Sequence, residues 1–240
     1  MTPPTIARRT RPHRAAGALA LLLALLLASC GGDDTPPAAL PEPTALLEGA
    51  AARMERVRSL HFVLDHEHGA TVIVRNIAMT HAEGDLVAPD QMQATLKGGL
   101  GPVNFEVGVV IIGGDAWIQN PLNRRWEDED ITIDQVFDPR EGVVALVRSA
   151  QSPRVTAIER VDGVDAYRVE ATVDSGDLTI LPGNPPAGRA VPATAWIGVE
   201  DQLVRRVELR GGVATGEPDN LVRRLTLSRF DEDVSIVPPR

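Results

Sequence analysis

A hydrophobic period of two residues runs through most of the sequence after Leu60, and it constrains the fold more than any other feature. It is clearest over residues 103–112, where every second side chain is apolar. Alternate side chains of a β-strand point to opposite faces, so the pattern predicts strands with one apolar face. Tight turns are predicted at Gly98-Gly99, Gly113-Gly114 and Asp162-Gly163, and they indicate antiparallel hairpins. The predicted strands are residues 61–68, 71–75, 77–83, 91–97, 103–112, 116–119, 154–161, 164–173, 194–199, 203–210 and 221–230, with a short extended piece at 234–237.

Helical spacing of apolar residues occurs in only two segments. These are residues 44–59, with Thr44 as the expected N-cap, and residues 139–150. Residues 178–181 are expected to form a further short helix or an irregular segment. A sheet of about ten strands curls, and its apolar face needs a cover that two short helices only partly provide. The expected fold class is therefore α+β, with a large curved antiparallel sheet. An under-filled apolar concavity suits a greasy ligand, although a well-packed β-sandwich would show the same pattern.

The N-terminal segment has the three parts of a secretory signal. Arginines at positions 8, 9, 11 and 14 precede an apolar run over residues 15–28, and small residues follow. This run of about 14 residues is shorter than the roughly 18 to 20 needed to cross a bilayer. The sequence Leu27-Ala28-Ser29-Cys30, which holds the single cysteine, resembles the lipobox of bacterial lipoproteins. In a lipobox the cysteine is acylated with diacylglycerol and becomes the first residue of the mature protein. The alternative is an ordinary signal peptide with an incidental Cys30.

The lipobox implies three parts of the chain. Residues 1–29 would be the lipoprotein signal peptide, residues 30–43 a flexible, lipid-anchored tether rich in Gly and Pro, and residues 44–240 the domain. Two acyl chains on Cys30 are enough for stable anchoring, and the tether would extend up to roughly 40 Å. The expected location is the extracytoplasmic face of the cell membrane.

Charge excludes some classes of partner. The sequence has 24 Lys and Arg against 33 Asp and Glu, and four of the arginines belong to the signal segment, so the expected mature chain has a net charge of −13. Such a chain is unsuited to nucleic acid, whose binding requires clusters of Lys and Arg. It is equally unsuited to broad electrostatic adhesion to an anionic bilayer. No second cysteine is available for a disulfide, so the core alone must hold the fold.

An ordered series of short segments resembles the LppX/LprG (LppX_LprAFG) family of bacterial lipid-binding lipoproteins. The segments are Cys30, VRSLHF (57–62), AEGDLVAPD (82–90), GGDAWI (113–118), Trp126, FDP (137–139), VDGVDAYRV (161–169) and AWI (195–197). The resemblance covers nearly the whole expected mature chain. It implies a LolA/LppX-like half-open β-barrel wrapped over a few helices. It also implies a hydrophobic cavity for acylated lipids or glycolipids and a role in carrying them through the cell envelope.

Catalytic or metal-binding patterns are weak in this sequence. There is no Gly-x-Ser-x-Gly motif, and we expect no enzymatic activity, cofactor or metal site. His66-Glu67-His68 could place two imidazoles on one strand face for a metal, or simply form a solvent-facing pair at a rim. The acidic runs 127–130 and 231–233 are interpreted as solvated turns.

The leading hypothesis is a membrane-anchored carrier of acylated lipids or glycolipids. The alternative is an envelope sensor or scaffold that binds a protein partner through the half-barrel, and an envelope transporter or other membrane protein is a possible partner in either case. An apolar strand face and the helix expected to cover it supply the candidate cavity residues, each of which could instead belong to an ordinary core. They are Val72, Val74, Leu96, Phe105, Val107, Val109, Ile111, Val143 and Leu146.

Overall fold

The computed structural model describes residues 40–73, 77–133, 138–178, 181, 185–214 and 216–240. Residues Leu40–Arg240 form one compact unit. The lipobox with Cys30 and the candidate Val74 lie outside the described residues.

Twelve strands of the described chain form one antiparallel sheet that does not close on itself. The confirmed fold is thus a large open antiparallel sheet with two helices. The strands are β1 (Ser59–Glu67), β2 (Thr71–Ile73), β3 (Ile77–Val87), β4 (Gln91–Leu100), β5 (Val103–Ile112), β6 (Asp115–Gln119), β7 (Trp126–Glu129), β8 (Gln151–Val161), β9 (Val164–Asp174), β10 (Ala190–Gly198), β11 (Val204–Arg210) and β12 (Val222–Ser228).

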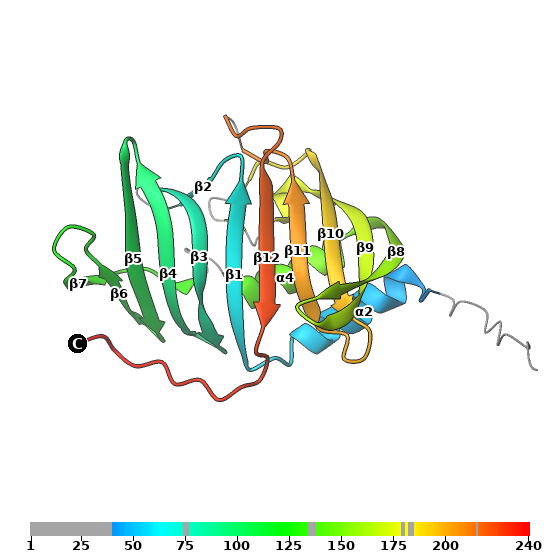
Figure 1. Ribbon diagram of the computed structural model, residues 1–240, viewed down its shortest axis with the longest axis horizontal. Coiled ribbons are helices and arrows are strands. Elements are labelled where there is room, and N and C mark those ends of the chain that lie inside the picture. Colours follow the sequence, from blue (N-terminus) through cyan, green and yellow to red (C-terminus); the bar gives the residue numbers. More distant parts are fainter. Residues whose placement is uncertain (1–39, 74–76, 134–137, 179–180, 182–184, 215) are drawn as a thin grey trace, which may run out of the picture. The chain divides into compact units, whose positions relative to one another are not determined.

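Strand β1 lies in the middle of the sheet, between β3 and β12 (Figure 1). On one side the order continues through β4, β5 and β6 to β7; on the other it continues through β11, β10 and β9 to β8, while β2 pairs with β3. In the register of these central strands, Phe62 lies opposite both Gly84 of β3 and Leu227 of β12. Residues in register share a face, so these strands contribute to the same inner surface.

The two helices are α2 (Pro43–Met54) and α4 (Pro139–Ser149). They pack against each other, and α2 contacts β8 while α4 contacts β9. The expected N-cap of α2 was wrong: the carboxylate of Glu42, not Thr44, accepts hydrogen bonds from the backbone N–H groups of Thr44 (3.0 Å) and Ala45 (2.6 Å). These backbone hydrogen bonds lower the pKa of the Glu42 carboxyl. Pro43 fits directly after the cap because the first helical residue needs no N–H donor.

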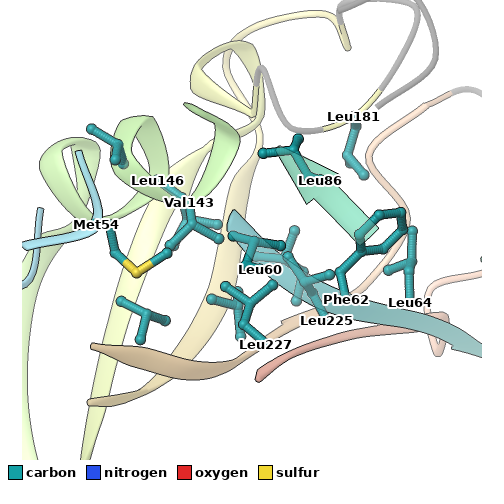
Figure 2. Packing of buried hydrophobic residues seen from close by; sticks show 14 of the residues in the cluster. Met54, Leu60, Phe62, Leu64, Leu86, Val143, Leu146, Leu181, Leu225 and Leu227 are labelled. Atoms are coloured by element: carbon teal, nitrogen blue, oxygen red, sulfur yellow. The ribbon is translucent and has the colours of Figure 1, made fainter. Parts of the chain in front are cut away.

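One main core cluster lies between the helices and the concave face of the sheet. Met54 of α2 and Val143 of α4 lie toward Leu60 and Leu227 of the two central strands (Figure 2). The cluster continues along the same face to Phe62, which is 1% exposed. Every second residue of the central strands therefore enters this core, as the period of two predicts.

Several predicted boundaries differ from the structure; the helix expected at 44–59, for example, ends at Met54. Gly98-Gly99 was expected to form a turn, but both residues lie inside β4, and the turn is displaced to Gly101, whose φ is +58°. A Cβ on Gly98 would come within 2.7 Å of the Ala78 carbonyl oxygen, so this glycine allows close approach of two strands. A 3₁₀ turn lies at Ser175–Asp177, and residues 179–180 of the short helix or irregular segment expected at 178–181 lie outside the described residues. The hairpin at Asp162-Gly163 is confirmed, with positive φ at both residues.

Candidate functional site

The structure brings most of the candidate cavity residues together. Six are buried in the main core cluster, and Phe105 is partly buried against it. Val72 is different, because it is 52% exposed on β2. The six buried residues are Leu96, Val107, Val109, Ile111, Val143 and Leu146.

The hollow directly under the helices is small, although a hollow of about 310 Å³ opens beside it between α2, the end of α4 and Pro153 of β8. The hollow between α2, α4 and the facing strands β9 and β10 has a volume of only about 10 Å³. Its lining is apolar and includes Leu47, Leu146 and the small side chains Ala171, Ala193 and Ala195. The candidate residues therefore form a packed interior here, and a bulky ligand would have to displace it.

A larger hollow, here called the mouth pocket, opens at one end of the concave face. It has a volume of about 550 Å³ and lies between β2, the β9–β10 connection and the β11–β12 connection. Leu181 and Val213 line it and also belong to the buried core cluster, so the floor of the pocket is the end of the core. Its lining residues are Ala70, Thr71, Val72, Leu181, Pro185, Pro186, Val213, Ala214, Gly216, Glu217, Pro218 and Arg223.

A buried arginine marks the boundary between the mouth pocket and the core. Arg223 of β12 is 2% exposed. Its Nε donates to Thr71 Oγ1 (2.9 Å) and its Nη2 donates to Glu217 Oε1 (2.5 Å). The other oxygen of Glu217 accepts hydrogen bonds from the backbone N–H groups of Val213 (2.7 Å) and Ala214 (3.2 Å). Burial alone would raise the pKa of Glu217, but the hydrogen bonds and charge of Arg223 together with these backbone donors hold it below its usual value.

His66 extends this network on the neighbouring strand. Its Nδ1 lies 3.1 Å from the Thr80 carbonyl oxygen, and its Nε2 lies 2.7 Å from Thr71 Oγ1. A carbonyl oxygen only accepts, so Nδ1 carries the proton and Nε2 accepts from the Thr71 hydroxyl. Burial, aided by the charge of Arg223, lowers the pKa of His66 to about 4. The imidazole is therefore neutral at pH 7.

The arrangement proposed for His66 and His68 on one strand face is not seen. β1 ends at Glu67, and His68 is exposed with a φ of 64°, whereas His66 is half-buried in the network with Arg223. No cluster of three or more His, Cys, Asp or Glu side chains suited to a metal ion occurs in the described part of the chain.

A second hollow of about 510 Å³ is polar and lies over β1 and β3–β7. Its lining includes His61, Glu83 and Asp85, with His61 Nδ1 2.8 Å from Asp85 Oδ1. Trp126 closes one side, with its ring so near Gly108 that a Cβ there would lie 2.6 Å away. This charged lining is unsuited to acyl chains, so the mouth pocket is the candidate site for an apolar ligand.

An open half-barrel with an apolar interior and a pocket that continues into it defines a class of proteins suited to hydrophobic ligands. The family assignment is direct. The model of the LppX_LprAFG lipoprotein family matches residues 42–236, and the chain belongs to this family.

Similar proteins agree with the assignment. The lipoarabinomannan carrier protein LprG of Mycolicibacterium smegmatis is 24% identical over 243 residues, covering 96% of this chain and 99% of the relative. The crystal structure of LprF from Mycobacterium bovis has a TM-score of 0.66 at 16% identity, over 83% of this chain and 99% of that one. That of LppX from Mycobacterium tuberculosis has a TM-score of 0.59 at 19% identity, over 81% and 97%. These two structures support the fold.

Sequence reasoning missed the network of Arg223, Glu217 and Thr71. A signal was present, because Arg223 precedes Leu225 and Leu227 at the same period of two. An arginine in the apolar register of a strand indicates a buried charge that needs a partner.

Proposed function

We propose that this chain is a carrier of acylated lipids or glycolipids, and that the mouth pocket is where the acyl chains enter. The observation that carries the proposal is the continuity of the pocket with the core, through Leu181 and Val213. The relative LprG is named a lipoarabinomannan carrier protein, which supports the same function. The proposal assigns no catalytic step to the chain.

The driving force would be desolvation of the acyl chains. Each methylene that leaves water contributes about 0.8 kcal/mol, so a chain of about fifteen carbons gains roughly 10 kcal/mol before ordering costs. This gain in free energy must also offset the free energy needed to open the interior, because the hollow directly under the helices measures only about 10 Å³.

The helices are the elements that can move to make room. The sheet is held by ladders of backbone hydrogen bonds, whereas α2 and α4 contact β8 and β9 through side chains. Moving a helix away from the sheet therefore breaks no ladder. The small side chains of Ala171, Ala193 and Ala195 line the hollow next to Leu146, so a shift of α4 would open space above them.

Attachment at Cys30 completes the proposal. Within the described residues no helix is long and apolar enough to cross a membrane. A diacylated Cys30 followed by the tether 30–43 would hold the domain 44–240 on the extracytoplasmic face of the cell membrane. There it could take lipid from the bilayer and pass it to an envelope transporter or another acceptor.

The test uses residues 31–240, which lack the lipidation site, purified from a bacterial host. Native mass spectrometry is expected to detect bound lipid, and a fluorescent fatty acid is expected to bind and be displaced by phospholipid. Ala214→Trp, which fills the mouth pocket, should weaken probe binding at least tenfold. Ala157→Trp on β8, another half-buried alanine, serves as the control. A protein that carries no lipid and leaves the probe unbound would refute the proposal.

A further inference from the structure

The sheet edge that carries the mouth pocket also carries exposed apolar side chains. β4 and β5 meet there in a turn in which Leu100 is 50% exposed and Val103 is 56% exposed. Val72, which lines the mouth pocket, is 52% exposed. Its partner Ala78 in β3 pairs in turn with Gly99, next to the β4–β5 turn. Figure 1 draws this turn and the β11–β12 connection at the same upper edge of the sheet.

Charge is distributed unequally between the two edges of the sheet. Residues 98–105 and residues 69–73 at the mouth edge contain no charged side chain. The part of this edge formed by the ends of β1 and β11 and by the β9–β10 and β11–β12 connections is charged, with Glu67, Asp177, Arg189, Arg210, Glu217 and Asp219. The opposite edge carries carboxylates in its strand connections and in the segment after β12. These are Asp90, Asp115, Asp162, Glu200, Asp201, Asp231, Glu232 and Asp233, and they outnumber the arginines of the same edge, Arg56, Arg58 and Arg229.

We propose that the mouth edge, defined by Val72, Leu100, Pro102 and Val103, is a docking surface for a lipid bilayer. Exposed apolar side chains gain free energy on entering the interfacial region, and the two uncharged segments 69–73 and 98–105 desolvate no ion when they enter it. The acidic edge is repelled by an anionic bilayer and faces away from it. Docking in this orientation places the mouth pocket against the lipid headgroups. The inference rests on the proposed function, because a carrier has to receive its lipid from a membrane.

Docking through the apolar mouth edge differs from the attraction of a basic protein patch to anionic lipids. The net charge of the whole sequence is −9, so binding to the bilayer is expected to depend on apolar contact and to respond little to salt. A few exposed side chains give only weak partitioning of the protein into the bilayer. The tether would compensate by keeping the domain at a high local concentration near the membrane.

The experiment measures contact of the mouth edge with a bilayer. Residues 31–240, with a histidine tag in place of the lipidated cysteine, are held on phosphatidylcholine vesicles by a nickel-chelating lipid. This segment has no cysteine, so Leu100→Cys can be labelled uniquely with an environment-sensitive dye. Ile158→Cys on β8 is the matched control, because Ile158 is 51% exposed on a distant strand. The dye at position 100 is expected to shift to the blue and brighten at least twofold, while the dye at position 158 stays unchanged.

A second arm measures transfer of a fluorescent lipid between vesicles. The double variant Leu100→Ser, Val103→Ser, which leaves the lining of the mouth pocket intact, is expected to slow transfer at least tenfold, and Ile158→Ser to leave the rate unchanged. Both variants should still bind a fatty acid probe in solution, which separates docking from lipid binding. The proposed docking surface is refuted if the emission of the dye at position 100 stays that of a water-exposed dye on both neutral and anionic vesicles. That result would point to a protein partner. The docking surface is also overturned if transfer survives the double variant.

Discussion

The guanidinium of Arg223 and the carboxylate of Glu217 meet at 2.5 Å where the apolar interior opens to the mouth pocket. Both side chains are withdrawn from water, with 2% and 12% of their surface exposed. Arg223 projects from the inward register of β12, whereas Glu217 belongs to the β11–β12 connection. The ion pair therefore ties this connection to the end of the core.

Removal of the Glu217 carboxylate should lower the free energy of unfolding more than an ordinary surface mutation does. Glu217→Ala leaves the Arg223 charge buried without a counter-ion, and it also removes the acceptor of two backbone donors. We expect the free energy of unfolding to fall by about 3 kcal/mol. Urea unfolding gives this value. The exposed Glu232→Ala is the control and should change stability by less than about 0.5 kcal/mol. Equal effects of the two variants would mean that the pair contributes nothing measurable.

Stability should depend on pH through His66. The unfolded chain protonates this imidazole near pH 6.5, whereas burial lowers its folded-state pKa to about 4. Between these values the unfolded state binds more protons, so stability is complete above pH 6.5 and decreases as the pH falls toward 4. We expect a loss of about 2 kcal/mol across this window, reduced by solvent screening from the roughly 3 kcal/mol of the full shift.

His66→Gln should remove this slope, because an amide can satisfy Thr80 and Thr71 without titrating. Urea unfolding at several pH values from 4 to 7 measures the slope for both proteins. His68→Gln should keep the wild-type slope. A slope that persists in His66→Gln would assign the pH dependence to other groups.

Close packing between β3 and β4 should make Gly84 sensitive to substitution. A Cβ at this position would lie 2.2 Å from the Gln93 carbonyl oxygen and 2.7 Å from Ala94 Cα. Backbone atoms cannot rotate away, so Gly84→Ala should destabilise the protein by roughly 3 kcal/mol. Gly114→Ala, which meets open space, should leave the thermal midpoint nearly unchanged. Similar midpoints for the two variants would contradict the close approach.

Packing of the interior should compete with the ligand. Leu146 is 2% exposed, so Leu146→Ala should lower the free energy of unfolding by about 2 to 4 kcal/mol. If the ligand displaces this packing, the same variant should bind a fatty acid probe more tightly, because less energy is needed to open the interior.

Val161→Ala is the control for that comparison. Val161 is also 2% exposed, but it belongs to a small separate cluster with Ala166 and Trp196. This variant should lose stability without a change in probe affinity. If Leu146→Ala binds the probe more weakly and Val161→Ala binds it normally, the ligand contacts the interior without displacing its packing.

Elements with strong local patterns were predictable from the sequence. β5 covers the predicted residues 103–112 because its apolar period is uninterrupted. α4 was predicted to within one residue, since Asp138 and Pro139 supply a cap and a first helical residue. Errors arose where tertiary contacts decide. Gly98 fits a turn equally well by composition, and only its approach to β3 keeps it within β4.

The candidate site was harder to predict, for a physical reason. A period of two assigns a residue to a face, so Val107, Val109 and Ile111 were placed together. It does not distinguish the filled part of a concave face from its rim, where Val72 lies. Arg223 was missed because its ion partner, Glu217, lies in a connection without regular periodicity.

The central position of β1 has a consequence for how the chain reaches its native state. β1 pairs with β12, the last strand of the sheet, and Phe62 lies opposite Leu227. The two halves of the sheet are therefore joined only after residues 222–228 have been synthesised. Until then β1 has an unsatisfied edge, and such long-range pairing slows folding and exposes the chain to aggregation. Loss of β12 by truncation would leave two separate sheets with no common core.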